Sequence, residues 1–274
     1  MQKLPRFIHW TRASTILLSG FLLVIGLILY VWWPLAQEYL AYIDWHGDWW
    51  LYIDWLLIGI FLFMSFTIVA HADLRTDGLI VLVATVGGLV IEAWGTQTNL
   101  WFYYTSERPP LWIIPAWPIA TLSIDRITRT LSYFLPKENK RIYQTLYWLA
   151  FISFYTLMLI FVAPTFDEPY TILALLLCAL LILTPTNYRL ALLVFIAGVG
   201  LGYFLEFWGT TRQCWIYYTY QTPPLFAVLA HGMAAVAFWR TGLMLKKIGK
   251  RFGLFKPQPI EAQTEPSRSI RREA

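Results

Sequence analysis

Charged residues are scarce in this chain, and their scarcity excludes an ordinary water-soluble domain. Asp, Glu, Lys and Arg make up 14% of the sequence, whereas they make up about a quarter of soluble globular proteins. Hydrophobic residues reach 58%. A composition this apolar is typical of membrane proteins. We therefore expect an integral membrane protein.

The chain also lacks the motifs by which metals and nucleotides are commonly bound. Its four histidines form no His-x-x-x-His cluster, which argues against a di-iron or zinc enzyme. There is no Gly-rich phosphate loop, no Gly-x-Ser-x-Gly nucleophile elbow and no Asp-rich motif for prenyl diphosphates. The two cysteines, Cys178 and Cys214, show no metal-ligand spacing, and we expect no disulfide between them. The sequence thus predicts a protein with no metal site and no cofactor.

Long apolar runs are abundant. A helix needs about 20 mostly apolar residues to cross the hydrocarbon core of a bilayer. We predict an all-α, polytopic membrane protein with about eight transmembrane helices. The candidate spans are Ser14–Trp33, Trp49–Ala70, Gly78–Trp94, Leu111–Phe134, Tyr143–Val162, Tyr170–Thr184, Leu190–Trp208 and Leu225–Leu245.

The positions of lysine and arginine predict the orientation of these spans. If the N-terminus is cytoplasmic, 19 of the 21 basic residues lie inside and only Arg108 and Arg212 lie outside. Cytoplasmic loops carry this excess of basic residues. We predict a multi-pass protein of the cell inner membrane with both termini in the cytoplasm, and we expect Asp125, Arg126 and Arg129 to form an ion cluster at the cytoplasmic interface. The net charge of +5 then reflects topology, and no nucleic-acid partner is expected.

Two stretches of the chain repeat each other at a separation of 114 positions. Residues 92–96 read Glu-Ala-Trp-Gly-Thr, and residues 206–210 read Glu-Phe-Trp-Gly-Thr. The likeness continues through Trp-x-Tyr-Tyr-Thr and Pro-Pro-Leu, which end at Leu111 in the first copy and at Leu225 in the second. The chain is therefore an internal duplication.

The duplication predicts two four-helix repeats. We place the first repeat at 1–135, a cytoplasmic linker at 136–142, the second repeat at 143–247 and a basic cytoplasmic tail at 248–274. Because four spans return the chain to its starting side, the repeats should be parallel and related by a pseudo-two-fold axis along the membrane normal.

Glycines and prolines of the repeated stretch have predicted local roles. Gly95 and Gly209 are expected to end their helices as C-caps. Pro115 and Pro118 remove backbone donors, so they are expected to kink the fourth span near its outer half.

Each repeat places one carboxylate, Glu92 or Glu206, among aromatic side chains at the outer end of a span. Ionisable residues within spans are rare and usually face protein or a cavity. Burial penalises the charged form of a carboxyl, so Glu92 and Glu206 are candidate catalytic proton donors. The expected substrate-binding lining is Trp94, Trp101, Tyr103, Tyr104, Trp208, Trp215, Tyr217, Tyr218 and His231.

A protonated carboxyl beside aromatic rings suits one type of chemistry. It can protonate an alkene, and ring faces attract the resulting carbocation. Capture by water gives hydration, and capture by a neighbouring double bond gives cyclisation. The alternative is a structural role, in which the carboxylates bond Thr96 and Thr210 or the tyrosine hydroxyls of their own loops.

The segment Glu92-x-x-Gly95-Thr96-x-Thr98, followed by Tyr103 or Tyr104 and by Pro109 and Pro115, resembles the signature loop of integral-membrane carotenoid hydratases of the bisanhydrobacterioruberin-hydratase kind. Its Trp-x-Tyr followed by proline is similar to a feature of membrane lycopene cyclases, whose fused forms are tandem repeats. The chain lacks the Pro-x-Glu-Glu segment of the cyclases and the Phe-Gly that precedes the hydratase Tyr. The resemblance implies a carotenoid or related isoprenoid substrate and acid-initiated chemistry, and it leaves hydration (a lyase activity) and cyclisation (an isomerase activity) both open.

Three functions thus compete. The first is a membrane enzyme of carotenoid or isoprenoid biosynthesis. The second is a non-catalytic subunit that binds pigment or lipid or assists assembly, and the third is a proton-linked transporter using the same glutamate pair. All three imply a lipophilic small molecule or membrane lipid as partner, and the oligomeric state stays open.

Overall fold

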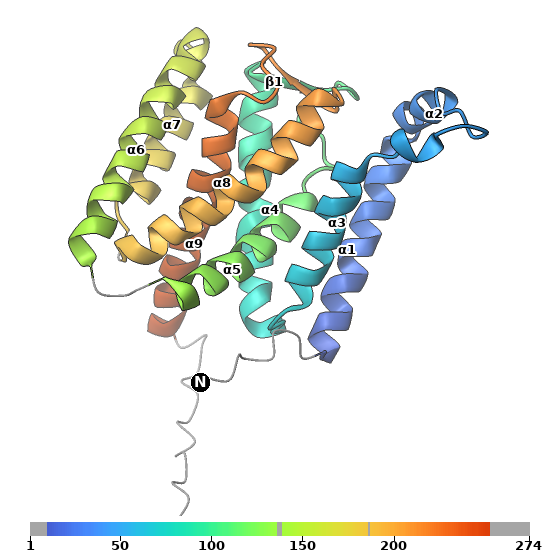
Figure 1. The fold of residues 1–274 in the computed structure, drawn as a ribbon. Helices are drawn as coiled ribbons and strands as arrows, with labels where there is room; N and C mark the ends of the chain where they lie inside the picture. The colour runs from blue at the N-terminus through green and yellow to red at the C-terminus, as the bar shows by residue number, and fades with distance from the viewer. Residues whose placement is uncertain (1–9, 136–138, 186, 253–274) are drawn as a thin grey trace, which may run out of the picture. The chain divides into compact units, whose positions relative to one another are not determined.

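The computed structural model describes residues 10–135, 139–185 and 187–252. These parts of the chain are mainly helical (Figure 1). The helices are α1 (Arg12–Val31), α2 (Trp33–Ala41), α3 (Trp55–Val69), α4 (Leu74–Gln97), α5 (Ala116–Phe134), α6 (Lys140–Val162), α7 (Pro169–Ile182), α8 (Tyr188–Thr211) and α9 (Leu225–Arg251). Short 3₁₀ helices, η1 (Trp49–Leu51) and η2 (Ala163–Thr165), and two strands, β1 (Trp101–Tyr103) and β2 (Trp215–Tyr217), complete the described elements.

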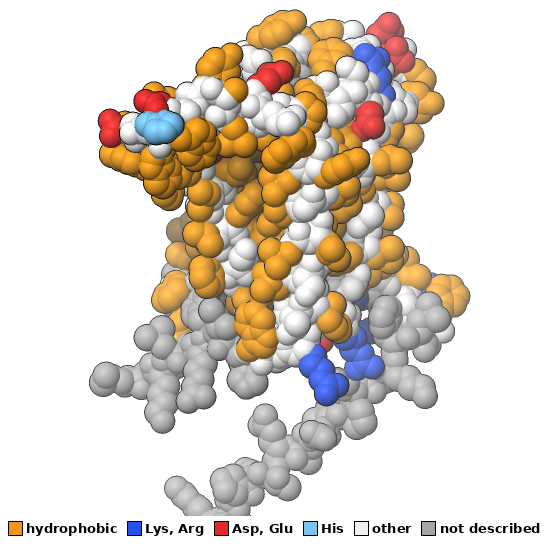
Figure 2. Space-filling view, turned by 90° about the vertical axis from the view of Figure 1, so that its right-hand side faces the viewer, with side chains coloured by type: hydrophobic (Ala, Val, Ile, Leu, Met, Phe, Trp, Pro, Cys, Tyr) orange, Lys and Arg blue, Asp and Glu red, His pale blue; other side chains and the backbone are white. Residues whose placement is uncertain are grey.

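Five of the described helices are long and apolar enough to cross a membrane. They are α1, α4, α6 extended through η2, α8 and α9, and the apolar helices α3 and α7 are shorter. Each predicted span falls mainly on one of the helices α1 and α3 to α9, but α5 is not among the helices apolar enough to cross a membrane. On the face drawn in Figure 2, hydrophobic side chains run along the helices, and acidic side chains gather at the end where β1 lies. The described chain therefore has the surface of a helical membrane protein.

The start of α5 corrects one prediction. The helix begins at Ala116 with Pro115 as its N-cap, and Pro118 lies in its first turn. The predicted kink inside the fourth span is therefore wrong. The first turn is where proline fits a helix, because the backbone N–H groups there have no intrahelical partner to lose.

Helices α4 and α8 are matched throughout, since their bounds differ by the same 114 positions as the sequence repeat. Gly95 and Gly209 lie inside the last turns of these helices, so the prediction that they are C-caps is wrong. A Cβ atom on Gly95 would lie 1.8 Å from the ring of Trp101, and one on Gly209 would lie 1.9 Å from the ring of Trp215. Glycine is required at both positions because an indole ring packs against the helix backbone.

The two repeated loops meet in a short antiparallel ladder. β1 pairs with β2 so that Trp101 lies opposite Tyr217 and Tyr103 lies opposite Trp215. The sequence analysis did not predict these strands, because each is only three residues long. The ladder joins the loop after α4 to the loop after α8.

The contacts of the chain divide it into two compact units, Met1–Gly242 and Leu243–Ala274. The first unit contains α1 to α8, both strands and most of α9, and all residues of the site described below belong to it. The predicted division into repeats at 136–142 stays a prediction. Residues 136–138 of the predicted linker and residues 253–274 of the predicted tail lie outside the described residues.

Candidate functional site

Glu92 lies in α4 and is almost completely buried, with 4% of its surface exposed. Its Oε2 accepts a hydrogen bond from the indole N–H of Trp101 at 3.0 Å. Its Oε1 accepts two, from the Tyr103 hydroxyl at 2.9 Å and from the indole N–H of Trp117 at 3.1 Å. Three aromatic donors thus surround the carboxylate, two of them from the loop after α4 and one from α5.

Glu206 has the same surroundings in α8, with one change. Its Oε2 accepts from the Trp215 indole N–H at 2.9 Å, and its Oε1 accepts from the Tyr217 hydroxyl at 3.0 Å. The third partner is Nε2 of His231, which lies 2.9 Å from Oε1. Glu206 is as buried as its counterpart, at 4%. The two glutamates therefore occupy equivalent cages that differ only in whether the third partner is Trp or His.

Matched glycines make room for that third partner. A Cβ atom on Gly88 would lie 2.4 Å from the Trp117 side chain, and one on Gly202 would lie 2.4 Å from that of His231. Close helix approach of this kind is common in membrane proteins, where small residues let neighbouring backbones meet. Gly88 therefore lies where α4 meets Trp117 of α5, and Gly202 lies where α8 meets His231 of α9.

The two cages contact each other through the strand ladder. The ring centroids of Trp101 and Tyr217 are 5.9 Å apart, and those of Tyr103 and Trp215 are 6.0 Å apart. Each carboxylate is held by one Trp and one Tyr of its own strand, and these rings pack against the Tyr and Trp of the other strand.

A second contact joins the two cages through their third partners. The rings of Trp117 and His231 stack with centroids 5.9 Å apart and an angle of 16° between their planes. Because one ring bonds Glu92 and the other Glu206, the carboxylates lie on either side of one stacked pair. The sequence left open whether the glutamates share a site, and the contacts place them in one continuous aromatic cluster.

Burial has a clear effect on the two loop tyrosines. It raises the pKa of Tyr103 and of Tyr217 well above the usual range, and the adjacent carboxylates raise the pKa of each further. Both hydroxyls therefore stay protonated and serve as donors to Glu92 and Glu206.

Two of the predicted lining tryptophans point to other partners. The indole N–H of Trp94 donates to the hydroxyl of Thr171 in α7 at 3.1 Å. The indole N–H of Trp208 donates to the carboxylate of Asp54, the N-cap of α3, at 2.8 Å. Trp94 and Trp208 therefore tie α4 and α8 to neighbouring helices rather than holding the glutamates.

Tyr104 and Tyr218 also bond away from the carboxylates. The hydroxyl of Tyr104 donates to the backbone carbonyl of Val31 at the end of α1. That of Tyr218 donates to the carbonyl of Phe161 in α6 at 2.7 Å. Of the predicted lining, the structure brings together at the carboxylates Trp101, Tyr103, Trp215, Tyr217 and His231.

The hydrogen bonds also test the structural alternative, in which the carboxylates bond Thr96 and Thr210 or the tyrosine hydroxyls of their own loops. The hydroxyls of Thr96 and Thr210 each donate at 2.6 Å to the backbone carbonyl of the glutamate four residues earlier, and not to its carboxylate. The loop tyrosines do bond the carboxylates, as the structural alternative requires. The glutamates therefore hold their loops in place whatever else they do.

Sequence reasoning left Trp117 out of the predicted site. The signal for it was present, because Trp117 stands 114 positions before His231. A tryptophan within an apolar segment is usually a core residue, and only the structure shows that the indole N–H of Trp117 donates to Glu92.

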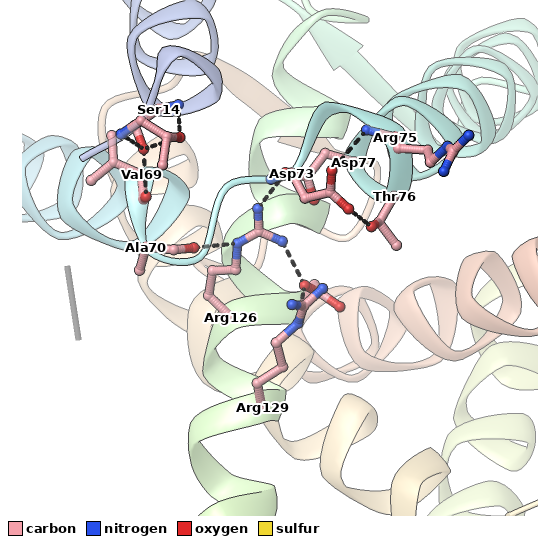
Figure 3. Close-up of polar contacts among 11 residues, drawn as sticks. Ser14, Val69, Ala70, Asp73, Arg75, Thr76, Asp77, Arg126 and Arg129 are labelled. Carbon is pink, nitrogen blue, oxygen red and sulfur yellow. Dashed lines mark hydrogen bonds and ion pairs between the residues drawn. The ribbon is translucent and has the colours of Figure 1, made fainter. Parts of the chain in front are cut away.

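A second polar cluster joins the first turn of α4, at Asp77, to Arg126 and Arg129 of α5 (Figure 3). Arg126 is buried and donates to Asp77 and to Asp125, each at 2.6 Å, and its Nε donates to the carbonyl of Ala70 at 2.9 Å. Arg129 pairs with Asp125 at 2.8 Å. The predicted ion cluster is confirmed in its contacts, but its most buried acid, Asp77, was not predicted as a member.

The matched positions of the second copy keep the arginine and lose the acids. Arg240 stands where Arg126 stands, and its Nε donates to Thr184 at 3.4 Å. Ala191 replaces Asp77 and Trp239 replaces Asp125. The ion cluster is thus a feature of the first copy, whereas the glutamate cage is present in both.

The loop after α8 borders a surface hollow of about 270 Å³. Trp215, whose indole N–H holds Glu206, is one of its lining residues. The residues that line it are Thr210, Thr211, Gln213, Trp215, Ile216, Tyr220, Gln221 and Thr222.

Among the described residues, no group of three or more His, Cys, Asp or Glu side chains is placed to hold a metal ion. No family model, curated protein or solved structure matches this chain. The candidate function therefore has to be argued from the glutamate cages.

Proposed function

We propose that the protein is a membrane enzyme that hydrates or cyclises a linear carotenoid or related isoprenoid by acid-initiated chemistry at Glu92 and Glu206. One observation carries the proposal. Each buried carboxyl is held by aromatic N–H and O–H donors, in a cluster of rings within an apolar helical bundle. Ring faces stabilise a cation formed beside them.

The proposed reaction begins with a carboxyl proton. It forms a C–H bond at the end of an alkene, the alkene π pair is consumed, and the neighbouring carbon becomes a cation. The remaining carboxylate keeps its aromatic donors, which act as fixed electrostatic support. In hydration, water forms a C–O bond with the cation and returns a proton to the carboxylate. In cyclisation, a second double bond attacks the cation, a C–C bond forms and the cation moves to the far carbon of that double bond, and a neighbouring C–H then returns its proton to the carboxylate.

The same proposal includes eight membrane spans in two parallel repeats, with both termini cytoplasmic. Support comes from the matched bounds of α4 and α8, from the matched glutamate cages and from the distribution of basic residues. Parallel repeats place both cages at the outer side of the membrane, beside the paired loops.

The test is product formation in a bacterial host that makes linear carotenes. Wild type is expected to yield a product heavier by one water, or an isomer of unchanged mass, by chromatography with mass detection. The double variant Glu92→Gln, Glu206→Gln is expected to lose that product, because glutamine cannot deliver a carboxyl proton.

The chain offers a matched control for this test. Glu107 is an exposed glutamate of the first outer loop, and its counterpart in the second copy is Gln221. Glu107→Gln should leave both product and membrane insertion unchanged. If the double variant makes as much product as wild type, or wild type makes none, the glutamates are not the acid of a polyene enzyme.

A structural role is the second candidate, and one observation favours it. All four carboxylate oxygens of the pair already accept hydrogen bonds, so the cages close the outer end of the bundle without a ligand. On this alternative the glutamine variants lower the amount of folded protein and change no metabolite.

A further inference from the structure

The two cages differ in the chemistry of their third partner. Trp117 offers Glu92 an indole N–H, which donates a hydrogen bond but does not release its proton in water. His231 offers Glu206 an imidazole nitrogen, which can either donate or accept. Because the rest of the cage is the same, this single position decides what each carboxylate can do.

The partners of Glu92 are two indoles and one phenol, and the phenol stays protonated. None of these three groups takes up or releases a proton near neutral pH. The cage of the first copy therefore contains no side chain that can exchange a proton with Glu92.

Glu206 is bonded by His231, a side chain that can exchange a proton and that is partly exposed. The His231 side chain is 19% exposed, whereas that of Glu206 is 5% exposed. Within the part of the chain that the structure describes, only Nε2 of His231 makes a hydrogen bond, to Oε1 of Glu206, so Nδ1 is available to a water or ligand. A proton can thus arrive at Nδ1 while Nε2 passes one to the carboxylate.

We propose that the exchangeable proton of this site is carried by Glu206 and His231 of the second copy, which narrows the proposed acid to Glu206, and that Glu92, held by Trp117, anchors the paired loops. The proton moves between Nε2 and Oε1, and the net charge of the pair is unchanged by the transfer. The inference rests on the proposed function for its role in catalysis, but the proton pair itself is independent of any substrate. It assigns His231 as the positioning and proton-supplying residue of the site.

Infrared spectroscopy of the purified protein tests the pair directly. A pH jump should produce a carboxyl band that converts between protonated and ionised forms. Glu206→Gln and His231→Trp should each remove this band, and Glu92→Gln should retain it. If wild type shows no such band, or if Glu92→Gln removes it and Glu206→Gln does not, the inference is overturned.

The duplication provides a reciprocal exchange as a second test. His231→Trp gives the second copy the partner of the first, and Trp117→His does the reverse. Gly202 and Gly88 leave equivalent room at the two positions, so both rings should be accommodated. In the double exchange the titrating band should depend on Glu92 and no longer on Glu206, and any product should follow the same switch. A folded double exchange whose band still depends on Glu206 would contradict the inference.

The two proposals fail in different ways. If wild type gives the band but no product, the proton pair stands and the polyene reaction is wrong. If product depends on Glu92 alone, the reaction stands and the assignment to the second copy is wrong. His231→Gln serves as a further control for folding, since its side chain can donate to Oε1 but cannot carry an ionisable proton.

Discussion

At the scale of single residues, the notable feature is the choice of donors around the buried carboxylates. A buried charge is costly unless hydrogen bonds replace its water. Trp and Tyr supply those bonds while keeping a large apolar body toward the bundle. The indole and phenol rings therefore serve two purposes, since they satisfy Glu92 and Glu206 and they also make the cluster compatible with lipid.

Cys214 gives a prediction at this scale. It is 3% exposed, and burial raises the pKa of its thiol to about 12. The thiolate is the reactive form, so at pH 8 roughly one thiol in ten thousand is reactive. In a Cys178→Ser variant we expect a maleimide to leave folded protein unlabelled at pH 8 and to label one thiol per chain after denaturation.

The control is a cysteine on the exposed rim of the same loop. Gln221→Cys on the Cys178→Ser background should be labelled quickly in the folded state. Equally fast labelling of Cys214 alone would mean that the loop around β2 opens, contrary to the packing described.

At the scale of elements, α8 and its loop depend on one close approach between a helix and a ring. Gly209→Ala would place a Cβ atom 1.9 Å from the Trp215 ring, and overpacking of this kind costs about 1–3 kcal/mol. Gly200→Ala in the same helix meets nothing within 4 Å, and it should gain about 0.5–1 kcal/mol from helix propensity. We expect thermal unfolding in detergent to show opposite shifts for the two variants. A stabilising effect of both would contradict the role of Gly209.

The same element shows what sequence could and could not predict. Apolar runs located the helices, because burial in lipid imposes length and composition. The repeat also pointed to both glutamates. Gly209 was misassigned as a C-cap because a glycine near a helix end can either cap the helix or make room for a packed side chain. Only the position of the Trp215 ring shows that Gly209 makes room for a side chain. The β1–β2 ladder and the bond from Trp117 to Glu92 were not predictable, since they join residues whose contacts depend on helix packing.

At the scale of the whole molecule, the duplication and the basic residues together predict how the chain crosses the membrane. Helix α4 has 24 residues and so extends about 36 Å, which exceeds the roughly 30 Å hydrocarbon core. Its two ends must then lie on opposite sides of the membrane if it spans. Arg75 lies in its first turn, Glu107 lies in the loop that follows it, and both are exposed.

Cysteine labelling in intact cells tests this claim on a background with Cys178→Ser and Cys214→Ser. A membrane-impermeant maleimide should label the Glu107→Cys variant and leave the Arg75→Cys variant unlabelled, and inverted vesicles should reverse the pattern. Labelling of both from outside would show that α4 does not span, whereas a reversed pattern would overturn only the orientation. Gln221→Cys completes the argument, because position 221 is the counterpart of position 107. Parallel repeats require both positions to be labelled from the same side. Protection of position 221 alone would mean that the two copies point in opposite directions. Their glutamate cages would then not share one face of the membrane.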